Sequence, residues 1–171
     1  MTTTLRLVKT NEREILANLL EKYEYDLSQF EGELADDINE RGLYGHYYTD
    51  QCWGDKKRWA YFIEADSKLA GFAYINTYSE SGDPEHDYYF ADFFVMHKYR
   101  RNGVGKSAFF QVLDLHKGRW KTGHHPNNAP SANFLAKYID EYTGGKFEFI
   151  EAYPSFTYNG GIHAGVYFWE S

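Results

Sequence analysis

Apolar and polar residues alternate in short runs, bounded by turn residues, at several places along the chain. These runs predict strands at residues 5–8, 59–65, 68–78, 87–96, 146–153 and 165–171. Residues 119–125 (RWKTGHH) are predicted as a further strand from their length. The turn residues between the second and third strands predict that these two form an antiparallel hairpin.

Apolar residues spaced three and four apart predict the helices. The first helix begins at Thr10 or Asn11, either of which can cap it, and continues after a break through residues 26–38. Two further helices are predicted over residues 104–117 and 130–142, each followed by glycine. The predicted fold is therefore α+β, with about seven strands in one mixed, mostly antiparallel sheet and about four helices around it.

Length, charge and cysteine content narrow the classes of function. A chain of 171 residues is expected to form one domain, residues 1–171. The net charge of −7 argues against a general nucleic-acid binder. Cys52 is the only cysteine, so a reducing, cytoplasmic setting is expected. The first ten residues lack the apolar core of a signal peptide, and no apolar run approaches the ~18 residues of a membrane span, so no membrane partner is expected.

The stretch YRRNGVGKSAF, residues 99–109, ends a predicted strand and opens a predicted helix. Its Gly-Lys-Ser also ends the P-loop of nucleotide hydrolases, but a P-loop would need glycine at position 100, where this chain has Arg100. The pattern Arg/Gln-x-x-Gly-x-Gly/Ala fits instead, over Arg100, Arg101, Asn102, Gly103, Val104 and Gly105. Free N–H groups at the start of the helix and the absence of side chains on the glycines suit a pyrophosphate.

Local charge agrees with that interpretation. Residues 97–121 contain seven Lys and Arg and one acid, Asp114, in a chain whose net charge is negative. Lys106 and Ser107 add a charge and a hydroxyl at the rim of the loop. A plain loop with solvated basic residues remains the alternative at this point.

The combination of motifs resembles the GNAT superfamily of acyl-CoA-dependent N-acyltransferases. Residues 91–109 are similar to the central strand, pyrophosphate loop and helix of that family. Asn128, Ser131 and Phe134 occupy the positions of its second signature, with a strand between the two motifs. The two motifs together span about residues 87 to 150.

The resemblance implies roles for individual residues. The main chain of Phe93, Phe94 and Val95 would bond the acetyl and pantetheine part of acetyl-CoA, because the family's strand splays from its neighbour there. The loop from Arg101 to Lys106 would wrap the pyrophosphate, and Asn128 would bond the pantetheine arm. Arg100 and Ser107 complete the predicted cofactor-binding set, and no metal site is predicted.

Two positions bear on proton transfer. Asp92 lies within an otherwise apolar strand, where an acid is costly unless it is paired or useful, and it is the candidate general base; the alternative is a carboxylate bonded to a turn or an arginine. Many members carry a tyrosine acid seven residues after the signature asparagine, but here that position is Leu135. Tyr138 is a candidate for the acid, and the thiolate could also take its proton from water, since a thiol has a pKa of about 8.5.

Two groups of ring-bearing residues leave alternatives open. His124 and His125 could suggest a metal, but no cysteine or spaced acid completes a ligand set, so they are interpreted as loop histidines. The aromatic residues of segment 42–58, a predicted loop, could line an acceptor pocket or form a small core of their own; they include Tyr44, Tyr47, Tyr48 and Trp53.

The resemblance implies a monomeric or homodimeric N-acetyltransferase that moves an acetyl group from acetyl-CoA to a primary amine by direct attack in a ternary complex. No cysteine lies near either motif, which argues against a thiol intermediate. Residues 11–40 carry ten acids against two bases, so the small-molecule acceptor could be cationic. The alternative is a non-catalytic acyl-CoA-binding regulator on the same fold.

Overall fold

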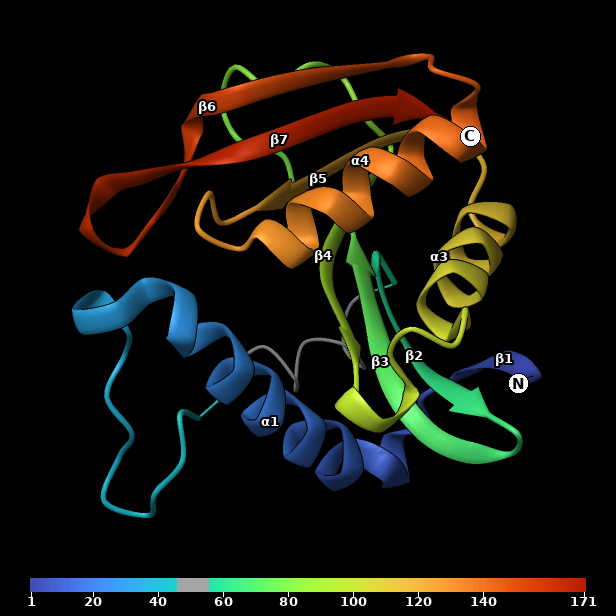
Figure 1. Ribbon diagram of the computed structural model, residues 1–171, viewed down its shortest axis with the longest axis vertical. Coiled ribbons are helices and arrows are strands. Elements are labelled where there is room, and N and C mark those ends of the chain that lie inside the picture. The colour runs from blue at the N-terminus through green and yellow to red at the C-terminus, as the bar shows by residue number, and fades with distance from the viewer. Residues whose placement is uncertain (46–55) are drawn as a thin grey trace.

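A seven-stranded mixed sheet runs through the whole molecule (Figure 1). The computed structural model describes residues 1–45 and 56–171. The strands follow the order β1-β2-β3-β4-β5-β7-β6, and only the β4–β5 pair is parallel. Their bounds are β1 Thr3–Leu7, β2 Arg58–Ala65, β3 Lys68–Asn76, β4 Tyr88–Val95, β5 Arg119–His124, β6 Phe147–Tyr158 and β7 Ile162–Glu170. The predicted α+β class, the mostly antiparallel sheet and the β2–β3 hairpin are confirmed.

Three α-helices occur in the described residues, not the four that were predicted. They are α1 (Arg13–Glu31), α3 (Val104–Leu115) and α4 (Ala129–Thr143). The predicted break in the first helix is wrong, because α1 runs unbroken to Glu31. Gly32, with φ of 60°, ends it by bonding its N–H to the Ser28 carbonyl, and a short 3-10 turn follows over Gly32–Leu34. None of the helices in these ranges is long and apolar enough to cross a membrane.

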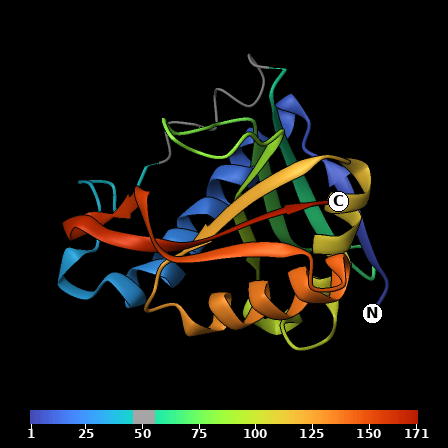
Figure 2. The ribbon, with the colours of Figure 1, turned by 90° about the horizontal axis from the view of Figure 1, so that it is seen from above.

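The helices cover opposite faces of the sheet (Figures 1 and 2). Helix α1 buries Leu16, Leu19 and Leu20 against the β2–β4 part of one face. Helices α3 and α4 pack on the other face, where Phe109, Leu113 and Ile139 meet the buried rings of the sheet; these rings are Phe90, Trp120, Tyr167 and Trp169. Each face of β4 is therefore lined by different helices.

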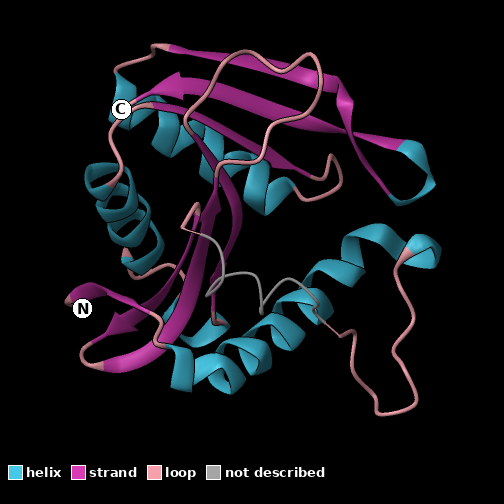
Figure 3. Ribbon diagram, turned by 180° about the vertical axis from the view of Figure 1, so that it is seen from behind, coloured by secondary structure: helices cyan, strands magenta, loops and turns pink. Residues whose placement is uncertain are grey.

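The β6–β7 hairpin is longer than predicted. Strand β6 continues past Pro154 to Tyr158, with two irregularities in its pairing with β7, so the predicted connection of residues 154–164 shrinks to a turn at Asn159–Gly161. Figure 3 shows this turn beside the end of α1. Asn159 Nδ2 donates to the Leu34 carbonyl (3.1 Å), and Asn127 Nδ2 donates to the Phe30 carbonyl (3.1 Å). The end of α1 is thus bonded to the segment between β5 and α4, and the 3-10 turn after it is bonded to the β6–β7 turn.

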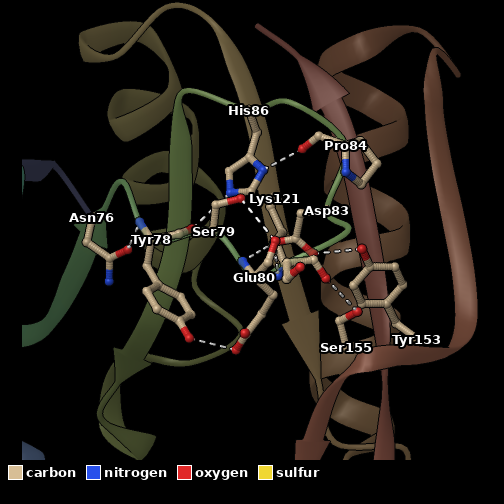
Figure 4. A network of polar contacts seen from close by, with 11 residues as sticks. Asn76, Tyr78, Ser79, Glu80, Asp83, Pro84, His86, Lys121, Tyr153 and Ser155 are labelled. Atoms are coloured by element: carbon tan, nitrogen blue, oxygen red, sulfur yellow. Dashed lines mark hydrogen bonds and ion pairs between the residues drawn. The ribbon is translucent and has the colours of Figure 1, made fainter.

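A buried ion pair holds the segment between β3 and β4, residues 77–87, onto strands β5 and β6 (Figure 4). Lys121 Nζ lies 2.7 Å from Asp83 Oδ2, and the two side chains are 2% and 0% exposed. The other Asp83 oxygen accepts from the Tyr153 hydroxyl (2.6 Å), and the Glu80 N–H donates to Oδ2 (2.8 Å). The ammonium also lies 5.4–5.7 Å from three ring centroids, those of Tyr89, Tyr153 and Phe156.

Candidate active site

Strands β4 and β5 separate part-way along their length. They pair only from Tyr88–Trp120 to Phe90–Thr122, where the Thr122 hydroxyl donates to the Phe90 carbonyl (2.9 Å). Beyond that point β4 stays with β3 while β5 stays with β7 (Figure 1). An irregularity in the β3–β4 pairing, at Ala91, accompanies the separation. The result is a gap in the middle of the sheet, edged by the second half of β4.

The pairing of β4 with β3 decides which main-chain groups face the gap. Met96 N–H donates to Ala70 O (2.8 Å), so by the alternation of an antiparallel ladder Phe94 also turns its main chain toward β3, while Phe93 and Val95 turn theirs to the gap. A Cβ on Gly71 of β3 would lie 1.9 Å from the Phe94 carbonyl oxygen, which agrees with the Phe94 main chain facing β3. Of the three residues predicted to bind the cofactor through their main chain, Phe93 and Val95 therefore face the gap, and Phe94 faces β3.

The loop after β4 presents backbone N–H groups at the start of α3. Arg101 and Gly103 have φ of 63° and 79°, and the first backbone bond of the helix is from Ser107 N–H to the Gly103 carbonyl (3.0 Å). Among the described residues, no acceptor bonds the N–H of Val104, Gly105 or Lys106. A Cβ on Gly103 would meet nothing within 4 Å, so the loop is open at the residue that precedes these N–H groups. This cradle fits a phosphate group.

Gly105 is needed for a different reason. A Cβ there would lie 3.1 Å from Phe134 Cε2, and the Phe134 ring in turn packs on Phe93 with 5.5 Å between ring centroids. A side chain at residue 105 would require the Phe134 ring to move, so glycine favours the close approach of α3 to α4. Gly105 therefore serves the packing of the two helices beside the gap.

Side chains of the loop mostly contact protein groups. Arg100 Nε donates to Val95 O (2.6 Å) and one terminal nitrogen donates to Asp26 Oδ2 (2.6 Å), so this side chain, predicted to bind the cofactor, is bonded to β4 and α1. Lys106 is paired with Glu141, and the Ser107 hydroxyl accepts from Gln111 Nε2 (3.0 Å). The structure therefore leaves the backbone N–H groups of the loop, more than its charged side chains, available to bind a phosphate.

Helix α4 forms the opposite wall of the gap. Asn128, which is 8% exposed, caps this helix by accepting the Ser131 N–H at Oδ1 (3.0 Å). Leu135 is buried in the core. The Tyr138 ring contacts α4 itself and, on α3, Phe110 (6.3 Å between centroids) and Lys106 (5.8 Å from Nζ). Tyr138 therefore lies beside α3.

The face of β4 toward α1 is acidic. Asp92 lies on the same face as Phe94, two residues along the strand, and next to the irregularity at Ala91. Burial, followed by the charges of Asp92 and Glu31, raises the pKa of Glu24 from 4.5 to about 7. Burial and then the Asp92 charge also raise the pKa of Tyr158. Glu24 and Tyr158, at distant sequence positions, therefore lie near Asp92. Glu24 belongs to the acidic stretch of residues 11–40, whereas no motif in the sequence marks Tyr158.

The two histidines pack as buried rings. His124 Nδ1 bonds the His125 carbonyl (3.1 Å), and its ring stacks on Phe149. His125 Nδ1 accepts the Asn127 N–H (3.1 Å), and its ring lies 4.8 Å from that of Tyr158. Burial, and then the His124 charge, lowers the pKa of His125. Over residues 1–45 and 56–171, no group of three or more His, Cys, Asp or Glu side chains could hold a metal ion.

A groove of about 640 Å³ runs between α1 and the end of β4. It is lined by Glu21, Lys22, Tyr25, Asp26, Gln29, Phe94, Met96 and His97. The N–H groups of Tyr44 and Gly45 bond the Glu21 carboxylate (2.8 and 3.0 Å), so the first part of the predicted loop 42–58 reaches this region. Tyr47, Tyr48 and Trp53 lie outside the described residues.

Comparison with known proteins agrees with the geometry. The model of the Acetyltransferase (GNAT) family matches residues 20–139. An acetyltransferase from Thermus thermophilus has a similar structure, with a TM-score of 0.67 at 14% identity over 100% of this chain and 98% of that one. A GNAT-family acetyltransferase from Streptococcus agalactiae gives 0.68 at 15% identity, over 99% and 95%.

The PaiA N-acetyltransferase of Thermoplasma acidophilum, solved in complex with coenzyme A, gives 0.60 at 12% identity over 100% of both chains. No curated protein matches the sequence at a significant level. At these identities the solved structures show a shared fold, and the family match covers most of the chain. The chain therefore belongs to the GNAT family of acetyltransferases, and it is an acyltransferase.

Proposed function

We propose that this protein transfers an acetyl group from acetyl-CoA to a primary amine of a small, cationic acceptor, by direct attack in a ternary complex. One observation carries the proposal. Strand β4 forms one edge of the gap between β4 and β5. The N–H cradle and α4 lie on one face of β4, and Asp92 lies on its other face, against α1. Two substrates can therefore meet at the gap from opposite sides.

The residues around the gap fit coenzyme A. The N–H groups from Val104 to Lys106 would hold the pyrophosphate, the main chain of Phe93 and the Val95 N–H would bond the pantetheine and acetyl part, and Asn128 would contact the arm from the other wall. When bound, acetyl-CoA supplies the acetyl group as a thioester. A main-chain N–H that faces the gap is suited to polarise a carbonyl there.

Asp92 is the proposed general base. An ammonium group must lose a proton before its nitrogen can attack, and a carboxylate beside the gap can accept it, directly or through a water. Glu24 adds a second carboxyl group to the same face, and its raised pKa of about 7 reflects burial among acids that a cationic acceptor would neutralise. The acidic α1 face therefore supports a cationic acceptor.

We assign the proton for the departing thiol to water. Leu135 cannot donate one, and the contacts of Tyr138 lie on α3 and α4, beside Lys106. A thiol with a pKa of about 8.5 leaves without strong acid assistance.

The test is the release of CoA from acetyl-CoA with a panel of aminoglycosides, polyamines, small amines and peptide N-termini. Asp92→Asn is expected to lower turnover by ~10²–10⁴ with little effect on acetyl-CoA affinity, and activity should recover partly at high pH, where the free amine is abundant. Asp140→Asn, an exposed aspartate of α4, is the matched control. Full activity of Asp92→Asn at neutral pH would show that Asp92 is not the general base. Parallel lines in a double-reciprocal plot of rate against the concentration of one substrate, at several concentrations of the other, would exclude the ternary complex.

A further inference from the structure

Arg100 connects helix α1 to the end of strand β4. Its Nε bonds the Val95 carbonyl at the end of β4 (2.6 Å), and its terminal nitrogen bonds Asp26 of α1 (2.6 Å). The other Asp26 oxygen lies 2.9 Å from His97 Nε2. The Asp26 side chain is 17% exposed, and that of Arg100 is 36% exposed. Burial alone would raise the pKa of Asp26, but the hydrogen bonds from Arg100 and His97 outweigh it and lower that pKa.

The connection lies along the groove between α1 and β4. Asp26 lines the groove from α1, and His97 lines it from the end of β4. At the inner end, Phe94 lies two residues from Asp92 on the same face of β4, and Glu21 lies one helical turn before Glu24. The groove therefore leads from the Asp26 cluster toward the proposed base.

We propose that Arg100 is a positioning residue, which sets the spacing between the acceptor helix α1 and the cofactor strand β4 through Asp26 and Val95, and that it is not a ligand of the pyrophosphate. This inference rests on the proposed function, which assigns the acceptor to the α1 side and the cofactor to β4. The planar guanidinium reaches a carbonyl and a carboxylate at once, which a lysine ammonium on a flexible stem does less well. Arg100 already occupies one acceptor site of Val95 O, so the Val95 N–H is the more available of its main-chain groups.

Substitutions of Arg100 and of Arg101 should therefore affect the binding of different substrates. Loss of the Arg100–Asp26 bond lets α1 shift relative to β4, so an amine in the groove is held less well at Asp92. The backbone N–H groups that cradle the pyrophosphate belong to residues 104–106 and need no contact from Arg100. Arg101, by contrast, is exposed within the loop itself, so its substitution should affect CoA.

The experiment compares Arg100→Gln, Arg100→Lys and Asp26→Asn, with Arg101→Gln and Asp37→Asn as matched controls. Calorimetry gives the Kd of CoA and of pantetheine, which lacks the pyrophosphate, and initial rates give the acceptor KM with the most active amine. Arg100→Gln and Asp26→Asn are expected to raise the acceptor KM by roughly 10- to 100-fold while the Kd of CoA changes less than about three-fold. The double variant should be no worse than either single one. Arg101→Gln should show the opposite pattern.

Hydrogen exchange provides a readout that needs no acceptor. Arg100→Gln and Asp26→Asn should both speed exchange in the second half of α1, whereas Arg101→Gln and Asp37→Asn should not. If Arg100→Gln weakens CoA strongly and pantetheine little, with α1 exchange unchanged, Arg100 is a pyrophosphate ligand and the inference is wrong. The failure of every amine as a substrate would overturn the proposed function instead, and the CoA and exchange measurements would still decide the role of Arg100.

Discussion

Replacing Lys121 by methionine should destabilise the protein severely, because it leaves Asp83 buried without its counter-ion. The Asp83 side chain is fully buried and would keep only the Tyr153 hydroxyl (2.6 Å) and the Glu80 N–H (2.8 Å). Breaking a buried pair from one side costs about 3–5 kcal/mol, a large part of the roughly 5–15 kcal/mol that stabilises an ordinary domain. A second substitution, Asp83→Asn, removes the stranded charge, so the double variant should recover much of that loss.

The pH dependence provides a second test. Burial would raise the pKa of Asp83, but the bonds from Lys121, Tyr153 and the Glu80 N–H outweigh it and lower that pKa below 3.8. The pair therefore stabilises the protein above the ordinary carboxyl pKa, and this contribution is lost as pH falls through the lowered one. In Lys121→Met the pKa of Asp83 should rise, so the deficit relative to wild type should narrow as the pH falls.

Urea unfolding at several pH values measures both effects. Lys68→Met, at an exposed strand position, is the matched control. A loss below about 1 kcal/mol for Lys121→Met, or a double variant as unstable as that single one, would refute the reasoning, because the pair would then carry no coupling.

Two further predictions concern the site. Gly103→Asn should weaken CoA strongly with a modest loss of stability, since asparagine tolerates the φ of 79° and its side chain would enter open space at the start of the cradle; Gly105→Val should also lower the melting temperature clearly, since its Cβ would lie 3.1 Å from Phe134. Calorimetry and thermal melting separate the two, and equal effects on both readouts would contradict these different roles. Because the pKa of Glu24 is raised from 4.5 to about 7, its ionisation destabilises the fold as the pH rises through that range, so Glu24→Gln should stabilise the protein at pH 8 and not at pH 4. A gain that does not depend on pH in urea unfolding would show that Glu24 does not titrate in this way.

Local patterns in the sequence predicted the elements whose requirements are local. The strands before and after the cradle, the turn at Gly103 and the start of α4 after Asn128 each depend on neighbours within a few residues, and the structure has them where they were expected. The errors in element bounds have local causes too. Gly32 permits the positive φ that ends α1, and the irregular pairing of β6 with β7 lets that strand continue past Pro154, a residue that usually ends a strand.

The partners of the chemically important groups were decided only by the tertiary structure. Arg100 meets Asp26 from 74 positions away, and Lys121 meets Asp83 from 38 positions away. The pairing of β4 with β3 turned Phe93 and Val95, and not Phe94, toward the gap. Such outcomes depend on which strands pair and in which register, because a side chain or an N–H group finds its partner only after the sheet has brought distant segments together. A linear motif can therefore mark the cradle, whereas the spacing of the acidic face opposite it emerges from the folded sheet.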